Sequence, residues 1–277
     1  PTRRYHCRLQ MHAELVLKTL MMGVVEGITE FLPVSSTGHL ILAGNALSFL
    51  AKEKRDVFEV FIQFGAMLAV IWEYRARLAS VVVSAHADQG SRRFLVNLAI
   101  AFMPAAVLGL LIGSHVQRLL FSPGPVAVAL VVGGIAILWA ERRPVQVKAE
   151  RAEQISRIDA LKIGFVQCLA LWPGTSRSGA TIIGGLWFGA SRQAATEFSF
   201  FLGIPILGAA SVYNLFKHWG ALSSDDIGVF AMGFIASFAF ALLAIRLLMR
   251  YLTGHGFGVF AWYRIALGTL ILVAVAT

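Results

Sequence analysis

The sequence predicts an all-α integral membrane protein built from two halves that are inverted relative to each other. Three observations carry this prediction: the composition, a series of long apolar stretches, and a match of the chain to itself at a fixed offset. Of the 277 residues, 57% are hydrophobic and 14% are charged, whereas soluble domains average roughly 45–50% apolar and 25% charged residues. Apolar stretches recur along the whole chain, so one membrane domain accounts for nearly all of it.

Eight apolar stretches divide into two kinds. Six are predicted as full crossings of the bilayer, at residues 57–74, 94–113, 125–140, 196–216, 226–249 and 257–276. The other two, residues 15–50 and 159–190, are interrupted by LPVSSTG and WPGTSRSG. Broken backbone at membrane depth is tolerated only inside protein or beside a water-filled cavity, so each is predicted as a re-entrant helical hairpin. The alternative is a pair of ordinary loops between short helices.

An offset of 141 residues aligns the two interrupted segments without a gap. It pairs Gly23, Val25, Glu26, Ser35, Thr37 and Gly38 with Gly164, Val166, Gln167, Ser176, Ser178 and Gly179. A second match, at an offset of 138, pairs Glu59, Phe61 and Gly65 with Glu197, Ser199 and Gly203. Each repeat, at about 15–140 and about 159–276, is therefore one hairpin plus three crossings. An odd number of crossings inverts the second repeat, so the hairpin tips are expected to meet near the bilayer midplane.

The basic residues predict the orientation. The net charge of +9 falls in short connectors rather than on one helix face, which argues against nucleic-acid binding. If both termini lie outside, the Arg-rich connectors 75–93 and 141–162 lie inside, as the positive-inside rule requires. Residues 1–10 are expected to be a tail before a single membrane domain at 11–277. Met11 is a candidate natural start, in which case the tail is not native.

The first hairpin carries two carboxylates. Glu26 and Glu30 are four residues apart, which places both on one helix face. Ionisable side chains inside a membrane usually mark a functional site, and two carboxylates at this spacing can share Mg²⁺ or Ca²⁺. The alternative is a buried pair satisfied by helix packing.

Both hairpin tips carry groups that bind anions. A new helix is predicted to begin near Thr37 and near Ser178, and free N–H groups at two helix starts would cradle a large anion. Arg177 adds a guanidinium that binds phosphate oxygens in a bidentate manner. Hydroxyl donors are supplied by Ser35, Ser36, Thr37, Ser176, Ser178 and Thr181. For any single serine, N-capping is the competing interpretation. His39, beside this cradle, suits a general acid or base.

The segments VVEGITEFLPVSSTGH and LWPGTSRSGAT resemble the two signature motifs of the bacterial undecaprenyl-diphosphatases of the bacitracin-resistance type. The resemblance runs from about Leu15 to the C-terminus. It implies hydrolysis of undecaprenyl diphosphate to undecaprenyl phosphate and inorganic phosphate, which recycles the lipid carrier for peptidoglycan synthesis. It also implies a divalent-cation requirement, location in the bacterial inner membrane with the site opening to the periplasmic side, and a homodimer.

The resemblance also assigns roles to individual residues. Glu26 and Glu30 are the metal and acid/base groups, Ser36 the nucleophile and His39 its proton partner. Arg177 stabilises the phosphate charge, helped by Ser176 and Thr181. Two mechanisms remain open, a phosphoseryl intermediate on Ser36 and direct attack by water that His39 activates.

A lipid flippase or transporter is the competing function, because inverted repeats with broken helices are also transporter architecture. A clustered His, Ser and carboxylate pair favours an enzyme, since a carrier needs only to bind its ligand. Oligomeric state is hidden, because Gly133 and Gly134 would serve close helix packing within one chain as well as between chains.

Overall fold

In the part of the chain that the structure describes, the protein is a bundle of α-helices with the short 3-10 helices η1 and η2. The computed structural model describes residues 2–217 and 226–276. Within them the helices are α1 (Thr2–Thr29), α2 (Ser36–Ala46), α3 (Lys52–Glu73), α4 (Arg75–Ser84), α5 (Gln89–Leu120), α6 (Pro123–Arg142), η1 (Ala152–Gln154), α7 (Arg157–Gln167), η2 (Cys168–Leu171), α8 (Arg177–Trp187), α9 (Arg192–Lys217), α10 (Ile227–Tyr251) and α11 (Gly258–Ala276). The predicted all-α class is confirmed.

Five helices of the described chain are long and apolar enough to cross a membrane. They are α5, α6, α9, α10 and α11, and they coincide with five of the six predicted crossings. The sixth, residues 57–74, lies in α3, which meets the requirement only together with α4, across a bend of 72°. The chain is therefore a multi-pass membrane protein with five spans, or six if the bent pair counts as one, in the part described.

Two segments outside the predicted crossings are helical. The expected tail, residues 1–10, continues α1 from Thr2 without a break, since no Gly or Pro precedes Gly23 except at residue 1. The connector 75–93 was predicted as a loop, and that prediction is wrong: it contains α4 and the first turn of α5. Its Val82 and Val83 are exposed, and the run RARLASVVVS holds no Pro or Gly that would prevent a helix.

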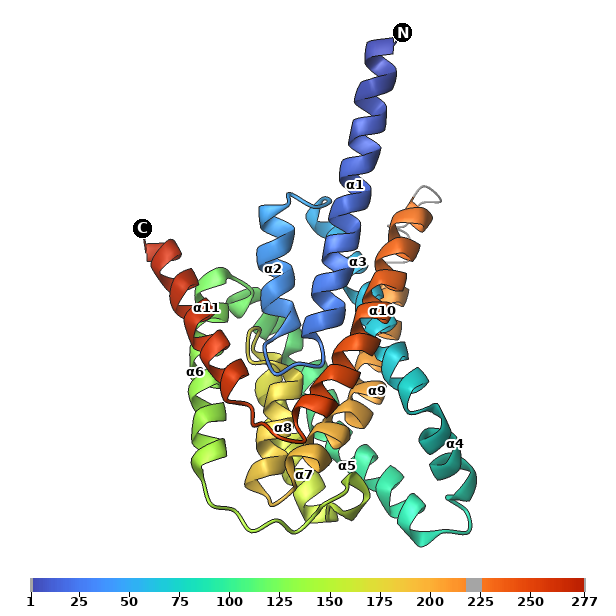
Figure 1. Ribbon diagram of the computed structural model, residues 1–277, viewed down its shortest axis with the longest axis vertical. Helices are drawn as coiled ribbons and strands as arrows, with labels where there is room; N and C mark the ends of the chain where they lie inside the picture. The colour runs from blue at the N-terminus through green and yellow to red at the C-terminus, as the bar shows by residue number, and fades with distance from the viewer. Residues whose placement is uncertain (1, 218–225, 277) are drawn as a thin grey trace.

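The two predicted hairpins approach each other from opposite ends of the molecule. In Figure 1, α1 descends from the upper end and α2 returns beside it, whereas α7 and α8 form a second hairpin from the lower end. The two turns contact each other, because the Ser178 hydroxyl donates to the Leu32 carbonyl at 2.9 Å. The start of α1 and the end of α11 both lie at the upper end, and the Arg-rich connectors lie at the lower end (Figure 1).

Glycines let the helices that carry the hairpins pack closely. A Cβ on Gly23 or Gly27 of α1 would lie 2.5 Å from a backbone oxygen of α10. Gly134 of α6 faces α11 in the same way, 2.7 Å from the Ala261 carbonyl oxygen. Both glycine contacts are thus made within one chain, and they bring α1 close to α10 and α6 close to α11.

Candidate active site

Each turn ends in a serine with an unusual backbone conformation. Ser35 and Ser176 have φ values of 74° and 70°, in a region that is costly for non-glycine residues and frequent at functional sites. Each caps the helix that follows it: the Ser35 Oγ accepts from the Gly38 N–H at 3.4 Å and the Ser176 Oγ from the Gly179 N–H at 3.0 Å. The capping interpretation holds for both serines, and the two turns share one backbone design.

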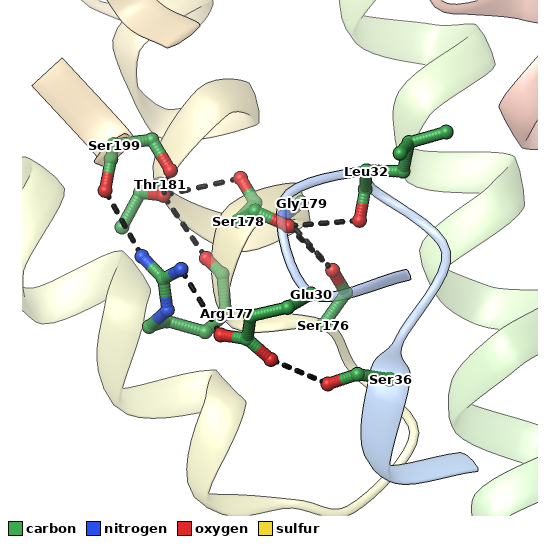
Figure 2. Close-up of polar contacts among 9 residues, drawn as sticks. All are labelled: Glu30, Leu32, Ser36, Ser176, Arg177, Ser178, Gly179, Thr181 and Ser199. Atoms are coloured by element: carbon green, nitrogen blue, oxygen red, sulfur yellow. Dashed lines mark hydrogen bonds and ion pairs between the residues drawn. The ribbon is translucent and has the colours of Figure 1, made fainter. Parts of the chain in front are cut away.

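Glu30 joins the first residues of the two capped helices. Its Oε2 accepts a hydrogen bond of 2.5 Å from the Ser36 hydroxyl, and its Oε1 lies 3.2 Å from Nη2 of Arg177 (Figure 2). Ser36 is the first residue of α2 and Arg177 the first of α8. Both side chains therefore reach the same carboxylate from opposite hairpins. A guanidinium buried without an acidic neighbour in sequence finds its partner 147 residues away.

A second shell of contacts holds the Arg177 guanidinium in place. Its Nη1 donates to the Ser199 carbonyl at 2.9 Å, and its Cζ lies 5.9 Å from the centre of the Phe31 ring. The Thr181 hydroxyl lies 3.0 Å from the Arg177 carbonyl and 2.6 Å from the Ser199 hydroxyl. Thr181 thus supports the arginine. The Nε–H of Arg177 is buried and unpartnered in the described structure, which leaves a donor for an incoming oxygen.

The Ser178 hydroxyl serves to dock the two turns. It donates to the Leu32 carbonyl of the other turn and lies 3.1 Å from the Ser176 hydroxyl (Figure 2). Ser178 is fully buried and Ser176 nearly so. Thr37 is half-buried in the first turn of α2. Of the six predicted hydroxyls, only Ser36 contacts a carboxylate.

Glu26 is the residue that fits a cation. It is fully buried, and neither of its carboxylate oxygens accepts a hydrogen bond from a donor in the described structure. The Glu30 carboxyl is its neighbour and already receives a donor on each oxygen. No cluster of three His, Cys, Asp or Glu side chains that could hold a metal occurs among the described residues. The donor set suits a hard cation such as Mg²⁺, which takes one or two carboxylates and fills its shell with water and phosphate oxygens.

His39 has other partners than those expected for it. Its Nδ1 lies 2.7 Å from the Ser35 carbonyl oxygen and its Nε2 lies 2.6 Å from the Tyr263 hydroxyl. Because a carbonyl can only accept, Nδ1 carries the hydrogen, and in the neutral ring Nε2 accepts from the tyrosine. Both ring nitrogens are engaged, and the Ser36 hydroxyl is bonded to Glu30 instead. The expected pairing of His39 with Ser36 is not what the structure shows.

Arg264 of α11 is the residue that the sequence reasoning missed. It is fully buried and donates four hydrogen bonds, all of them to backbone carbonyls. It makes no ion pair with any side chain in the described structure. The available signal was an arginine within the apolar run FAWYRIALG of the last predicted crossing, since charged residues inside a span are rare and mark important positions.

The family of the chain follows from comparison with known sequences. The family described as bacitracin resistance protein BacA matches residues 19–270. The chain belongs to this family. Its matched region includes every residue of the Glu30, Ser36 and Arg177 arrangement.

Curated relatives are similar over nearly their whole length. "Undecaprenyl-diphosphatase 1" of Chromobacterium violaceum is 62% identical over 93% of this chain and 96% of the relative. "Undecaprenyl-diphosphatase" of Nitrosospira multiformis is 58% identical over 94% of each chain. "Undecaprenyl-diphosphatase 2" of Rhodospirillum rubrum is 57% identical over 95% of this chain and 96% of the relative.

Proposed function

We propose that this protein hydrolyses undecaprenyl diphosphate to undecaprenyl phosphate and inorganic phosphate. The observation that carries the proposal is the Glu30 carboxylate, which binds the Ser36 hydroxyl on one oxygen and the Arg177 guanidinium on the other. A hydroxyl held by a base, next to a guanidinium, is what phosphoryl transfer needs, because that chemistry depends on positioning and charge stabilisation. The relatives' names supply the substrate.

The geometry favours Glu30 over His39 as the proton partner of Ser36. In the first step the Ser36 Oγ bonds to the terminal phosphorus, its proton passes to Glu30, and the bond to the bridging oxygen breaks to release undecaprenyl phosphate. A water oxygen then bonds to the phosphorus, the Oγ–P bond breaks, Glu30 returns its proton to the Ser36 Oγ, and both hydrogens of the water leave with inorganic phosphate. Attack by a water molecule that Glu30 deprotonates is the alternative. In both, Arg177 exchanges its contact with Glu30 for the phosphoryl oxygens, a bidentate arrangement that guanidinium suits.

A divalent cation completes the proposed site. Glu26, with two unpartnered oxygens, and Glu30 would hold Mg²⁺ or Ca²⁺. Such a cation supplies charge neutralisation for the phosphate oxygens. The Ser35, Ser176 and Ser178 hydroxyls set the shape of the cradle, and the first N–H groups of α2 and α8, beside Thr37 and Ser178, are donors for the anion.

We further propose that the two hairpins are re-entrant and that the halves are an inverted repeat. The opposed entry of the hairpins and the matching φ values of Ser35 and Ser176 support this (Figure 1). The gathering of Arg-rich connectors at one end favours N-out and C-out, with the site opening to the periplasmic side of the plasma membrane. Contact with membrane lipid follows from the exposed apolar helix faces. The homodimer stays a prediction.

Phosphate release from purified protein in detergent tests the function. Wild type should release inorganic phosphate from undecaprenyl diphosphate, and a chelator should stop the release. Ser36→Ala should lose at least about 10²-fold in kcat, the scale on which a reacting group contributes. Ser237→Ala is the matched control, because Ser237 is also buried but donates to the Ile62 carbonyl. Binding without release in the wild type would instead favour the carrier alternative.

A further inference from the structure

We propose that Arg264 is a positioning residue: it fixes the separation of the two hairpin turns and thereby the alignment of Glu30, Ser36 and Arg177. The proposal rests on the proposed phosphatase function of that site. Among the described residues, Arg264 makes no hydrogen bond or ion pair with any of the three and has no acidic partner. Its role has to be sought in what its guanidinium binds.

The guanidinium connects both turns to one helix. Nη1 donates to the Pro33 carbonyl of the first turn at 3.1 Å, and Nη2 donates to the Gly174 carbonyl of the second turn at 3.0 Å. Nη2 and Nε also donate to the α6 carbonyls of Ala129 at 3.1 Å and Leu130 at 3.3 Å. One rigid fork therefore joins α11 to the two turns and to α6.

The two turn carbonyls occupy equivalent positions in the repeat. Pro33 and Gly174 are separated by 141 residues, the same offset that pairs Ser35 with Ser176 and Gly38 with Gly179. Each precedes its capping serine by two residues. Arg264 thus binds the same backbone atom of both turns, although it belongs to only one half of the chain. This placement locks the turns to each other rather than supporting either one alone.

The space around the guanidinium is shaped by glycine. A Cβ on Gly133 of α6 would collide with the Arg264 guanidinium, and a Cβ on Gly179 of α8 would lie 3.3 Å from its Nη1. A buried cation without a carboxylate is costly, and here carbonyl dipoles supply its compensation. Because a misplacement of about 1 Å can cost about 10²-fold in rate, this clamp is expected to act on kcat.

Two variants distinguish the effect of the position of the Arg264 guanidinium from the effect of its charge. Arg264→Lys keeps the charge, but a single ammonium cannot span carbonyls on three elements. Gly133→Ala keeps the arginine and forces it to shift. Gly124→Ala is the matched control, since Gly124 lies on the same helix with nothing within 4 Å of an added Cβ. Arg77→Met controls for lost stability, because Arg77 forms ion pairs with Glu153 of η1 and Glu197 of α9 rather than with either turn.

The readouts are kcat and KM per folded molecule, with Tm measured alongside. We expect Arg264→Lys and Gly133→Ala to lower kcat by about tenfold or more while KM changes less than about threefold. Gly124→Ala should match the wild type, and Arg77→Met should lower Tm at unchanged kcat. Wild-type kcat in Arg264→Lys or in Gly133→Ala, whatever its Tm, would overturn the proposal. An inactive wild type would count against the proposed function instead.

Discussion

The two hairpin turns have the same backbone and opposite chemistry. Each places a serine with positive φ before a helix, and each helix begins with a residue that reaches Glu30. In the first turn that residue is Ser36, a hydroxyl that can react. At the equivalent position of the second turn it is Arg177, a cation that binds charge. The two turns therefore share a backbone conformation but place different chemical groups beside Glu30.

The residues around the two turns also differ: polar side chains surround Arg177, and apolar residues occupy the equivalent positions of the first half. Arg177 is supported by Thr181 and Ser199, whereas the positions equivalent to these two at the offsets of 141 and 138 hold Leu40 and Phe61. Glu30 itself corresponds to Leu171. The first half therefore contributes the base and the hydroxyl, and the second half contributes the cation with its support. Neither half holds a complete site.

Exchanging the two residues is the strongest way to break this comparison. The double variant Ser36→Arg, Arg177→Ser keeps the same groups in the opposite turns, but the new arginine would face apolar Leu40 and Phe61. We expect no detectable release of phosphate and a lower Tm. Activity within about tenfold of the wild type would show that the turns are interchangeable.

Removing the guanidinium of Arg177 is expected to have the next largest effect. Arg177→Ala should lower kcat by about 10³-fold or more, as for arginines that stabilise phosphoryl charge, and the protein should remain folded in size-exclusion chromatography. Glu30→Ala should also lower kcat by orders of magnitude, because it removes the partner of both Ser36 and Arg177. Full activity in either purified variant would take that residue out of the site.

A smaller effect is expected at His39. Its nitrogens are bound to the Ser35 carbonyl and the Tyr263 hydroxyl, away from Ser36, so His39→Gln should lower kcat by no more than about tenfold. Tyr263→Phe should behave alike, since it removes only one of these contacts. If His39→Gln lowered kcat as much as Ser36→Ala, by about 10²-fold or more, histidine would again be the proton partner of Ser36.

Much of this arrangement was predictable from the residues. The 141-residue offset and the broken apolar segments predicted two hairpins whose tips meet, and an arginine without an acidic neighbour in sequence, such as Arg177, indicates either a bound anion or a carboxylate from the other half. These features can be predicted because Pro, Gly or a charged residue inside an apolar stretch is compatible with only a few structures. The serine caps were predictable for the same reason.

Other contacts could not be predicted. Arg264 binds backbone carbonyls. Because every residue has a carbonyl, the residue type does not show which one accepts a hydrogen bond from an arginine. The partner of Ser36 is Glu30 rather than His39 because the path of the turn decides which side chains meet. That path includes a positive φ at Ser35, and two consecutive serines in a sequence do not predict such a conformation. Helix α4 was not predicted because arginines between two crossings are typical of a connector, although arginine is also a good helix former.

The central claim is that Glu30 and Arg177, from opposite hairpins, form one unit. A double-mutant cycle of the free energy of unfolding for Glu30→Gln, Arg177→Gln and the combined variant tests it without any substrate. Breaking a buried pair leaves one charge uncompensated, so each single variant should be destabilised, and the double variant should lose less than the sum, by about 1 kcal/mol or more. Strictly additive losses would contradict the account.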